Sequence, residues 1–212
     1  MKTKDRIIQA ALELFNQQGE RPITTNHIAA HIKISPGNLY YHYRNKSDII
    51  ARIFDQYEQS VAELFDLPKE RDITLEDRAQ LTEKLLALIW EYRFMHRDLV
   101  GMLANDPILK DRYQAFANRS IANTEQIYIR MRDSGFMLIP DNQIKPLALN
   151  VWILITSWTT YLGVARGIRE DQLTKEQLNQ VVYQMAHLEL PYLTEATQEE
   201  TEHLLATFGP NG

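Results

Sequence analysis

Apolar residues recur at helical spacing along almost the whole chain. Ile7, Ala11, Leu14 and Phe15 occupy positions i, i+4, i+7 and i+8, which form the apolar stripe of one amphipathic helix, and Gly19 is expected to end it. Runs in which apolar and polar residues alternate strictly extend over only a few positions. The pattern therefore predicts an all-α protein.

Helix-start signals divide the following segment, up to about residue 64, into three further helices. A short helix is expected to begin at Thr24. Ser35 followed by Pro36 is typical of an N-cap residue and a proline at the first helical position. Asn45 with Asp48 three residues later resembles a capping box, and it predicts a long fourth helix.

Prolines and glycines divide the rest of the chain into long helical pieces. These begin or end at the following signals: a start at Thr74 with Asp77, a start at Asp106 and Pro107 with an end at Gly135, a helix from about 143 to 166 with Gly167 as its stop, and a start at Thr174 with an end at Pro191. At the end of the third of these pieces, Gly163 and Gly167 form a GxxxG pattern, for which close helix packing and a C-terminal stop are expected.

Residues 24–46 contain two short helices separated by about four residues, which is the helix-turn-helix arrangement. On a helical wheel, the second helix directs Leu39 and Tyr43 toward the core. The outward face is polar and aromatic and has no acidic residue; it consists of Gly37, Asn38 and Tyr41, with Tyr40 and His42 on the flanks.

This outward face has the chemistry of a DNA-reading surface. Asn and His side chains can hydrogen-bond base edges in a major groove, and tyrosine hydroxyls can reach phosphate oxygens. The free N–H groups at residues 35–38 offer a further phosphate contact, and Gly37 allows close approach of the backbone to the duplex. The alternative is a small three-helix bundle with exposed tyrosines and no ligand.

The charge distribution fits a polyanion partner for the first part of the chain. Residues 1–46 contain seven Lys or Arg and three Asp or Glu, a net charge of +4. Because the whole chain has a net charge of −5, the remaining residues have a net charge of −9. A solvated charged face would give a similar distribution.

The composition and the apolar segments exclude several other kinds of site and location. There is no cysteine, which excludes disulfides and thiolate metal sites. The N-terminal segment lacks the pattern of a signal peptide, and the most apolar stretch, residues 147–155, is far shorter than the roughly 20 residues of a membrane span. We expect a cytoplasmic protein without a membrane partner.

Residues 24–46 resemble the DNA-binding domain of the TetR family of bacterial transcriptional regulators. The matching positions are Thr24-Thr25, Ile28-Ala29, Ser35, Gly37, Leu39-Tyr40-Tyr41-His42-Tyr43, Arg44 and Lys46. Tyr43 replaces the phenylalanine usual in the family, and Lys33 stands in the turn where the family mostly has glycine, which predicts a tighter or strained turn. The resemblance covers residues 1–50; beyond them it rests on the helix count and on residues 92–99.

The resemblance implies roles for individual residues. Thr24 or Thr25, Tyr41 and Lys46 would contact phosphates, and the groove would be lined by Asn26, Pro36, Gly37, Asn38, Tyr40 and His42. It also implies a DNA-binding domain at residues 1–46 and a larger helical regulatory and dimerisation domain at residues 47–212, with the helix at 47–64 as the link. The helices at about 143–166 and 174–190 would pair with a second subunit.

Aromatic residues in the larger domain are candidates for an effector pocket, since helical proteins place ligand cavities between helices. The candidates are Trp90, Phe94, Met102, Tyr113, Phe116, Tyr128, Trp152 and Trp158. Most of them are expected to be plain core. Arg93, His96 and Arg97 could supply a polar end to a pocket, or could pair with Glu91 and Asp98 at the surface.

Three functions follow. The first is a ligand-responsive repressor that binds a palindromic operator as a homodimer, with an apolar or amphipathic effector. The second is an architectural or cell-division-linked DNA-binding protein that recruits a protein partner without a small-molecule ligand. The third is an all-α enzyme or adaptor with a vestigial helix-turn-helix, but no catalytic motif or base–nucleophile pair supports an enzyme. His27 and His31 have metal-ligand spacing without a neighbouring acid, so we expect no metal and no cofactor.

Overall fold

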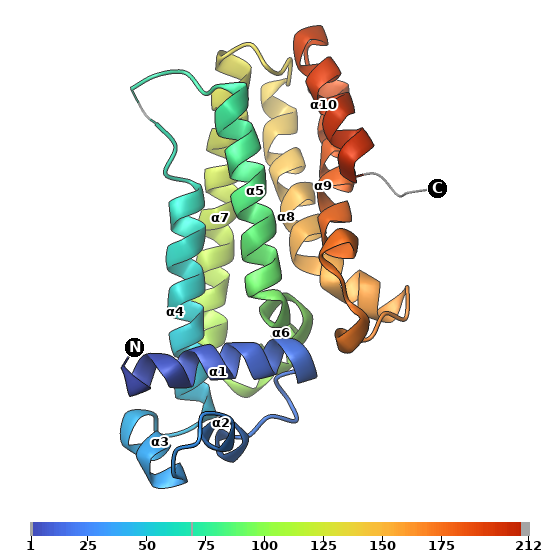
Figure 1. Cartoon of the computed structure of the whole chain (residues 1–212). Coiled ribbons are helices and arrows are strands. Elements are labelled where there is room, and N and C mark those ends of the chain that lie inside the picture. The colour runs from blue at the N-terminus through green and yellow to red at the C-terminus, as the bar shows by residue number, and fades with distance from the viewer. Residues whose placement is uncertain (1, 69, 209–212) are drawn as a thin grey trace.

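A computed structural model describes residues 2–68 and 70–208, and in them it contains α-helices and two short 3-10 helices (Figure 1). The α-helices of the N-terminal part are α1 (Thr3–Gln18), α2 (Thr25–His31), α3 (Pro36–His42) and α4 (Lys46–Leu64). They are followed by α5 (Leu75–Glu91), α6 (Arg93–Asn105), α7 (Pro107–Asp133), α8 (Asp141–Val164), η1 (Glu170–Gln172), α9 (Lys175–Glu189), η2 (Leu190–Tyr192) and α10 (Glu195–Phe208). The predicted all-α class is confirmed.

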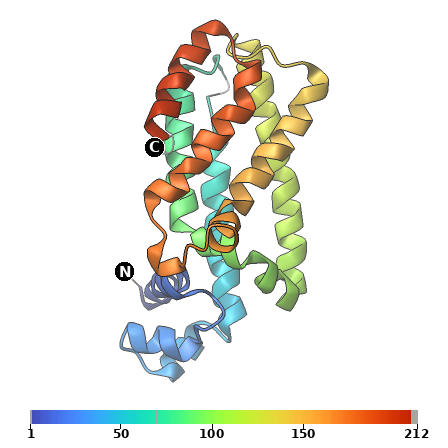
Figure 2. The same ribbon diagram turned by 90° about the vertical axis from the view of Figure 1, so that its right-hand side faces the viewer.

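The first three helices form a small domain at one end of the molecule. Figures 1 and 2 show α1 across the lower ends of the long helices, with α2 and α3 beneath it. The predicted stripe of α1 is fully buried, as are Ile28 of α2 and Leu39 of α3. Gly19 ends the helix as expected, with φ 88°, a backbone conformation that favours glycine.

α4 connects this small domain to the larger one. It begins at Lys46 and runs through 19 residues, about 28 Å, into the body of the molecule. The side chain of Asn45 accepts a hydrogen bond from the backbone N–H of Asp48 at 2.8 Å, which confirms the predicted cap. Tyr57, Val61 and Leu64 near the far end are buried against the larger domain.

The piece that begins at Thr74 is two helices, because the chain bends at Tyr92. The sequence has no proline or glycine there. The bend is held from outside: Asn16 of α1 donates its side-chain N–H to the carbonyl of Glu91 at 2.7 Å and accepts from the N–H of Phe94 at 3.1 Å. A tertiary contact therefore sets a boundary that local sequence does not mark.

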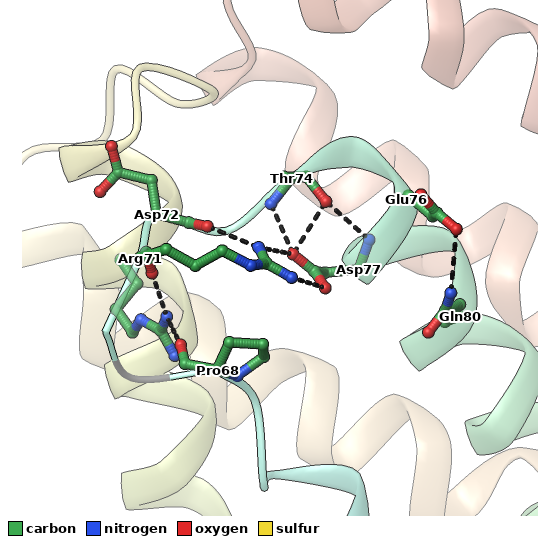
Figure 3. Close-up of polar contacts among 8 residues, drawn as sticks. Pro68, Arg71, Asp72, Thr74, Glu76, Asp77 and Gln80 are labelled. Carbon is green, nitrogen blue, oxygen red and sulfur yellow. Dashed lines mark hydrogen bonds and ion pairs between the residues drawn. The ribbon is translucent and has the colours of Figure 1, made fainter.

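The connection between α4 and α5 is fixed by polar contacts (Figure 3). Thr74 and Asp77 form the predicted capping box of α5, and Arg71 holds both carboxylate oxygens of Asp77 at 2.6 and 2.9 Å. These hydrogen bonds, first from Arg71 and then from Thr74, hold the pKa of Asp77 well below its ordinary value. Arg130 of α7 donates to the carbonyls of Pro68 and Arg71, so the connection is anchored to α7.

The later helices follow their predicted start and stop signals closely. Asp106 caps α7 and Thr174 caps α9, while Gly135 and Gly167 both have positive φ after α7 and α8. α8 is long and apolar enough to cross a bilayer by length and composition alone, and a third of its apolar window is buried inside the structure. In this fold α8 packs between α7 and α9 (Figure 2). α10 then lies against α9.

Candidate nucleic-acid interface and effector cavity

The turn between α2 and α3 adopts the conformation that glycine favours, although lysine occupies it. Lys33 has φ 58°, and the N–H groups of Lys33 and Ile34 donate to the carbonyls of Ala30 and Ala29. The predicted strain in the turn is therefore present as a left-handed backbone at a residue with a Cβ. Ser35 caps α3 by accepting from the N–H of Asn38 at 3.2 Å, as predicted.

The outward face of α3 is exposed as the helical wheel predicted. Leu39 is fully buried and Tyr43 almost so, while Tyr41 is 85% and Tyr40 48% exposed. The exposed residues of this face also include Pro36, Gly37 and Asn38, and His42 is half-buried with its ring edge against Tyr41. The face that would meet a duplex is thus solvent-accessible and contains no acid.

α2 supports this face from one side. The hydroxyls of Thr25 and Tyr40 lie 3.0 Å apart and tie α2 to α3. Thr24 caps α2 by accepting from the N–H of His27, and His27 Nδ1 accepts from the N–H of Thr24, so this histidine completes a capping box. Thr24 and Asn26 are exposed.

Lys46 has a structural role that the sequence did not reveal. Its ammonium donates to the carbonyls of Glu20 and Ile23 at 3.0 Å each and forms an ion pair with Glu20 at 2.7 Å. Three oxygens thus match the three N–H donors of the side chain. The phosphate contact of Lys46 stays a prediction, and it requires one of these partners to be exchanged for a phosphate.

A second set of contacts joins α1 to α6. Arg97 donates to the carbonyl of Phe15 at 2.8 Å and to both carboxylate oxygens of Asp98 at 2.9 and 3.0 Å. Asp98 in turn accepts from the backbone N–H of Glu20 at 2.8 Å. Together with Asn16, these residues fix the end of α1 to the bend between α5 and α6.

Most of the predicted pocket residues lie in packed core. Phe94, Met102 and Phe116 are buried, and Phe116 contacts the rings of Tyr113 and Trp152 at centroid distances of 5.8 and 5.7 Å. Trp158 is buried and donates its ring N–H to the carbonyl of Gln177, and Trp90 lies under the guanidinium of Arg93 at 4.2 Å. In the part of the chain that the structure describes, the plain-core alternative thus fits the packing of most of them.

His96 belongs to this core rather than to the surface. It is buried, its Nε2 lies 3.3 Å from the hydroxyl of Tyr57, and burial lowers its pKa to about 4. The imidazole is therefore neutral at physiological pH and joins α4 to α6.

Tyr128 is the predicted pocket residue that lines a cavity of about 100 Å³ among α4, α5, α7, α8 and α9. The walls are mainly apolar and include Leu64 of α4 together with Leu81, Leu85, Ile127, Met131, Val151, Ile155 and Met185. Its volume is below the roughly 300 Å³ at which small-molecule sites usually begin.

The polar end of this cavity was not predicted. Glu189, 4% exposed, accepts from the hydroxyl of Tyr128 at 2.8 Å and from Arg78 at 2.9 Å. Burial, and then the charge of Glu189, raises the pKa of Tyr128 well above its ordinary value, so its hydroxyl stays a donor. The ion pair joins residues 111 positions apart in the chain, a separation at which sequence spacing gives no indication.

Among the described residues, no group of three or more His, Cys, Asp or Glu side chains is arranged to hold a metal ion. His31 lies 3.5 Å from Glu13, and His27 is used by the α2 cap.

The fold and the exposed α3 face define a helical regulator with an N-terminal helix-turn-helix domain. Comparison with known proteins agrees: residues 7–53 match the model of the "bacterial regulatory proteins, tetR family", and residues 56–201 match the model of a "bacterial transcriptional repressor". The chain belongs to the TetR family, and it is a DNA-binding transcriptional regulator.

Individual relatives support the same assignment. The regulator UidR of Escherichia coli K12 is 30% identical over 178 residues, which cover 82% of this chain and 85% of UidR. A solved TetR-family regulator from Marinobacter aquaeolei VT8 has 45% identity and a TM-score of 0.89 and covers 99% of this chain and 100% of that one. The regulator AcrR of Shigella flexneri is 33% identical over 63 residues, 30% of this chain and 29% of AcrR. The match to AcrR therefore spans less than a third of that relative.

Proposed function

We propose that the protein is a ligand-responsive repressor that acts as a homodimer on a palindromic operator. The observation that carries the proposal is the exposed, acid-free face of α3, on which Asn38 and Tyr41 stand beside the capped start of the helix. A helix of this kind can enter the major groove with its N-terminal residues at the base edges.

The proposed contacts divide into two kinds. Tyr41 and Thr24, which are exposed, and Thr25, which is half-buried, would make phosphate contacts, which position the protein without reading sequence. Asn38, Tyr40 and His42 provide the hydrogen-bonding groups for base edges, and Asn26 stands beside them on α2. Pro36 and Gly37 line the approach, and Lys46 at the start of α4 completes the set.

Dimerisation is proposed through α8. Its outer face has an exposed apolar stripe of Leu149, Ile153, Tyr161 and Val164, which are 43%, 51%, 44% and 82% exposed. A stripe of this kind on a long helix fits self-association about a two-fold axis. α9 packs beside α8 and would join the same interface.

The effector is proposed to enter the cavity at Tyr128. Because its volume is about 100 Å³, a ligand of ordinary size has to displace lining side chains, and the flexible Met131 and Met185 are suited to this. The apolar walls favour an apolar or amphipathic compound, whose polar group would meet Glu189 or Arg78.

α4 would transmit the effect of ligand binding. Its Leu64 lines the cavity, and its Lys46 holds the connection between α1 and α2. A ligand that binds one tilt of α4 more tightly than the other shifts the equilibrium toward that tilt, and the separation of the paired α3 helices changes with it. The shift in the equilibrium is set by the difference in the ligand's affinity for the two tilts. Operator and effector must then weaken each other by the same factor.

Selection of bound duplexes from a random pool, together with sedimentation, tests the proposal. We expect a dimer at micromolar concentration and an inverted repeat whose half-sites lie about 34–36 Å, or a multiple of this, apart. A monomer that selects asymmetric sites would contradict it. For the effector, tryptophan fluorescence is titrated with and without operator; a compound that binds equally in both titrations is not an effector, and a broad screen without any binder favours the partner-recruiting function.

A further inference from the structure

A groove of about 340 Å³ lies away from the effector cavity, between the end of α8, the connection that follows it and the start of α6. Its volume falls within the range of small-molecule sites. The lining residues used below are Arg93 and Arg97 of α6, Thr159, Leu162 and Gly163 of α8, and Ile168 of the connection; Val164, at the end of the proposed dimer stripe, also borders the groove.

The half-buried guanidinium of Arg93 lines this groove and has no carboxylate partner among the described residues. It donates to the carbonyl of Trp90 at 2.8 Å and covers the ring of that residue, and within the described residues no acid lies within 4.0 Å of its nitrogens. Arg97 beside it is held by Asp98 and lies 3.7 Å from Glu170, which also lines the groove. Burial, and then the charge of Arg97, lowers the pKa of Arg93, as expected for a cation that lacks a counter-ion.

Thr159 provides an independent indication of a ligand. It is 4% exposed, and its hydroxyl has no hydrogen-bond partner within the described part of the chain. Thr156 on the same helix donates to the carbonyl of Trp152 at 2.8 Å, and Thr82 and Thr124 bond their own helices in the same way. A buried hydroxyl without a partner is costly, so one at the wall of a groove indicates a group that the ligand supplies.

One side of the groove is apolar and is opened by a glycine, while Arg169 and Glu170 line the side toward solvent. Leu162 and Ile168 line the apolar side, and a Cβ at Gly163 would meet only the carbonyl of Ile168, at 3.8 Å. Within this chain no other helix lies within 4 Å of that Cβ position, so the expected close helix packing at this glycine is not made inside the chain. The absence of a side chain at Gly163 widens the groove instead.

We propose that this groove binds an amphipathic monocarboxylate. Its carboxylate accepts hydrogen bonds from the Arg93 guanidinium and the Thr159 hydroxyl, and its hydrocarbon part lies along Leu162 and Ile168. Arg93 is the lining cation without a counter-ion in the described residues, and it stands beside the apolar Leu162 and Ile168. Glu170 adds a negative charge to the lining. This combination suits a monoanion with a tail better than the more highly charged inorganic phosphate. The proposal is separate from the DNA-binding function and is tested without DNA.

Octanoate, 1-octanol and inorganic phosphate are titrated into the full-length protein by calorimetry and by tryptophan fluorescence, because Trp90 and Trp158 adjoin the groove residues. We expect octanoate to bind at least about tenfold more tightly than either 1-octanol or phosphate, a factor that corresponds to about 1.4 kcal/mol. Equal binding of octanoate and 1-octanol overturns the proposal, and so does tighter binding of phosphate.

Variants locate the site. Arg93→Gln should weaken octanoate binding at least about tenfold and Thr159→Val about fivefold, the latter without loss of thermal stability. Gly163→Leu fills the groove, favours the helix and should abolish binding. Arg166→Gln is the matched control, since this exposed arginine of the same connection does not line the groove. Octanoate binding that survives both Arg93→Gln and Gly163→Leu overturns the proposal. The proposal is also overturned if the wild-type dimer does not bind octanoate, because a second copy or a core side chain would then fill the groove.

Discussion

The side-chain oxygen of Asn16 in α1 accepts a hydrogen bond from the backbone N–H of Phe94 at the start of α6, over 3.1 Å. The same side chain donates to the carbonyl of Glu91 at the end of α5. One buried amide thus supplies both partners for the bend between two helices of the larger domain, and it does so from the DNA-binding domain. The two domains are joined by this contact as well as by α4.

Asn16→Ala should lower the free energy of unfolding by about 1–3 kcal/mol, because it leaves the Phe94 N–H and the Glu91 carbonyl without their partner. Urea denaturation measures the change. Gln17→Ala is the control: this neighbour is exposed and should change stability by no more than about 0.5 kcal/mol. Equal effects of the two substitutions would mean that the Asn16 contact does not hold the bend.

Tyr43→Phe should raise the stability of the protein by about 1 kcal/mol. The Tyr43 hydroxyl is buried and has no hydrogen-bond partner among the described residues, and phenylalanine removes it without changing the packed ring. Thermal unfolding measures the change, and operator affinity should stay the same because Tyr43 faces the core. A clear loss of stability would show that the hydroxyl has a favourable interaction.

Lys33→Gly should be more stable than Lys33→Ala by about 1 kcal/mol. Both variants remove the same charge, but only glycine adopts φ 58° without strain. The gain is reduced by the greater freedom of glycine in the unfolded chain. Denaturant midpoints of the two variants decide this, and an alanine variant as stable as the glycine variant would contradict a strained turn.

His96 should make the protein less stable as the pH falls from 6.5 to 4. Burial lowers its pKa from 6.5 to about 4, so within this window the unfolded chain binds a proton that the folded protein excludes. The loss reaches about 3 kcal/mol relative to a His96→Gln variant, which lacks the group. His187→Gln removes an exposed imidazole and serves as the control. Parallel stability curves for wild type and His96→Gln would refute the prediction.

Local chemistry accounts for the parts of the fold that the sequence predicted. The caps at Ser35, Asn45 and Thr74 and the stop at Gly167 each depend on residues within a few positions of one another. The exposure of Tyr41 likewise follows from the helical wheel.

What could not be predicted depends on residues far apart in the chain. Asn16 sets the bend at Tyr92 from another domain, and Arg78 reaches Glu189 across the cavity. The sequence shows which residues of the larger domain are aromatic, but it does not show which of them line a cavity. Tyr128 therefore lines a cavity while Phe116, equally aromatic, fills the core.

The central claim is that α3 reads base sequence in two symmetric half-sites, and site selection with Asn38→Ala tests it most directly. We predict that the variant loses its preference at one base position, the same one in both half-sites, with a cost of about 1–3 kcal/mol for the preferred base. Asn142→Ala, at an exposed asparagine of α8, should select the wild-type site. If Asn38→Ala selects the wild-type site and weakens binding to operator and random DNA by the same factor, α3 does not read sequence through this residue and the account is contradicted.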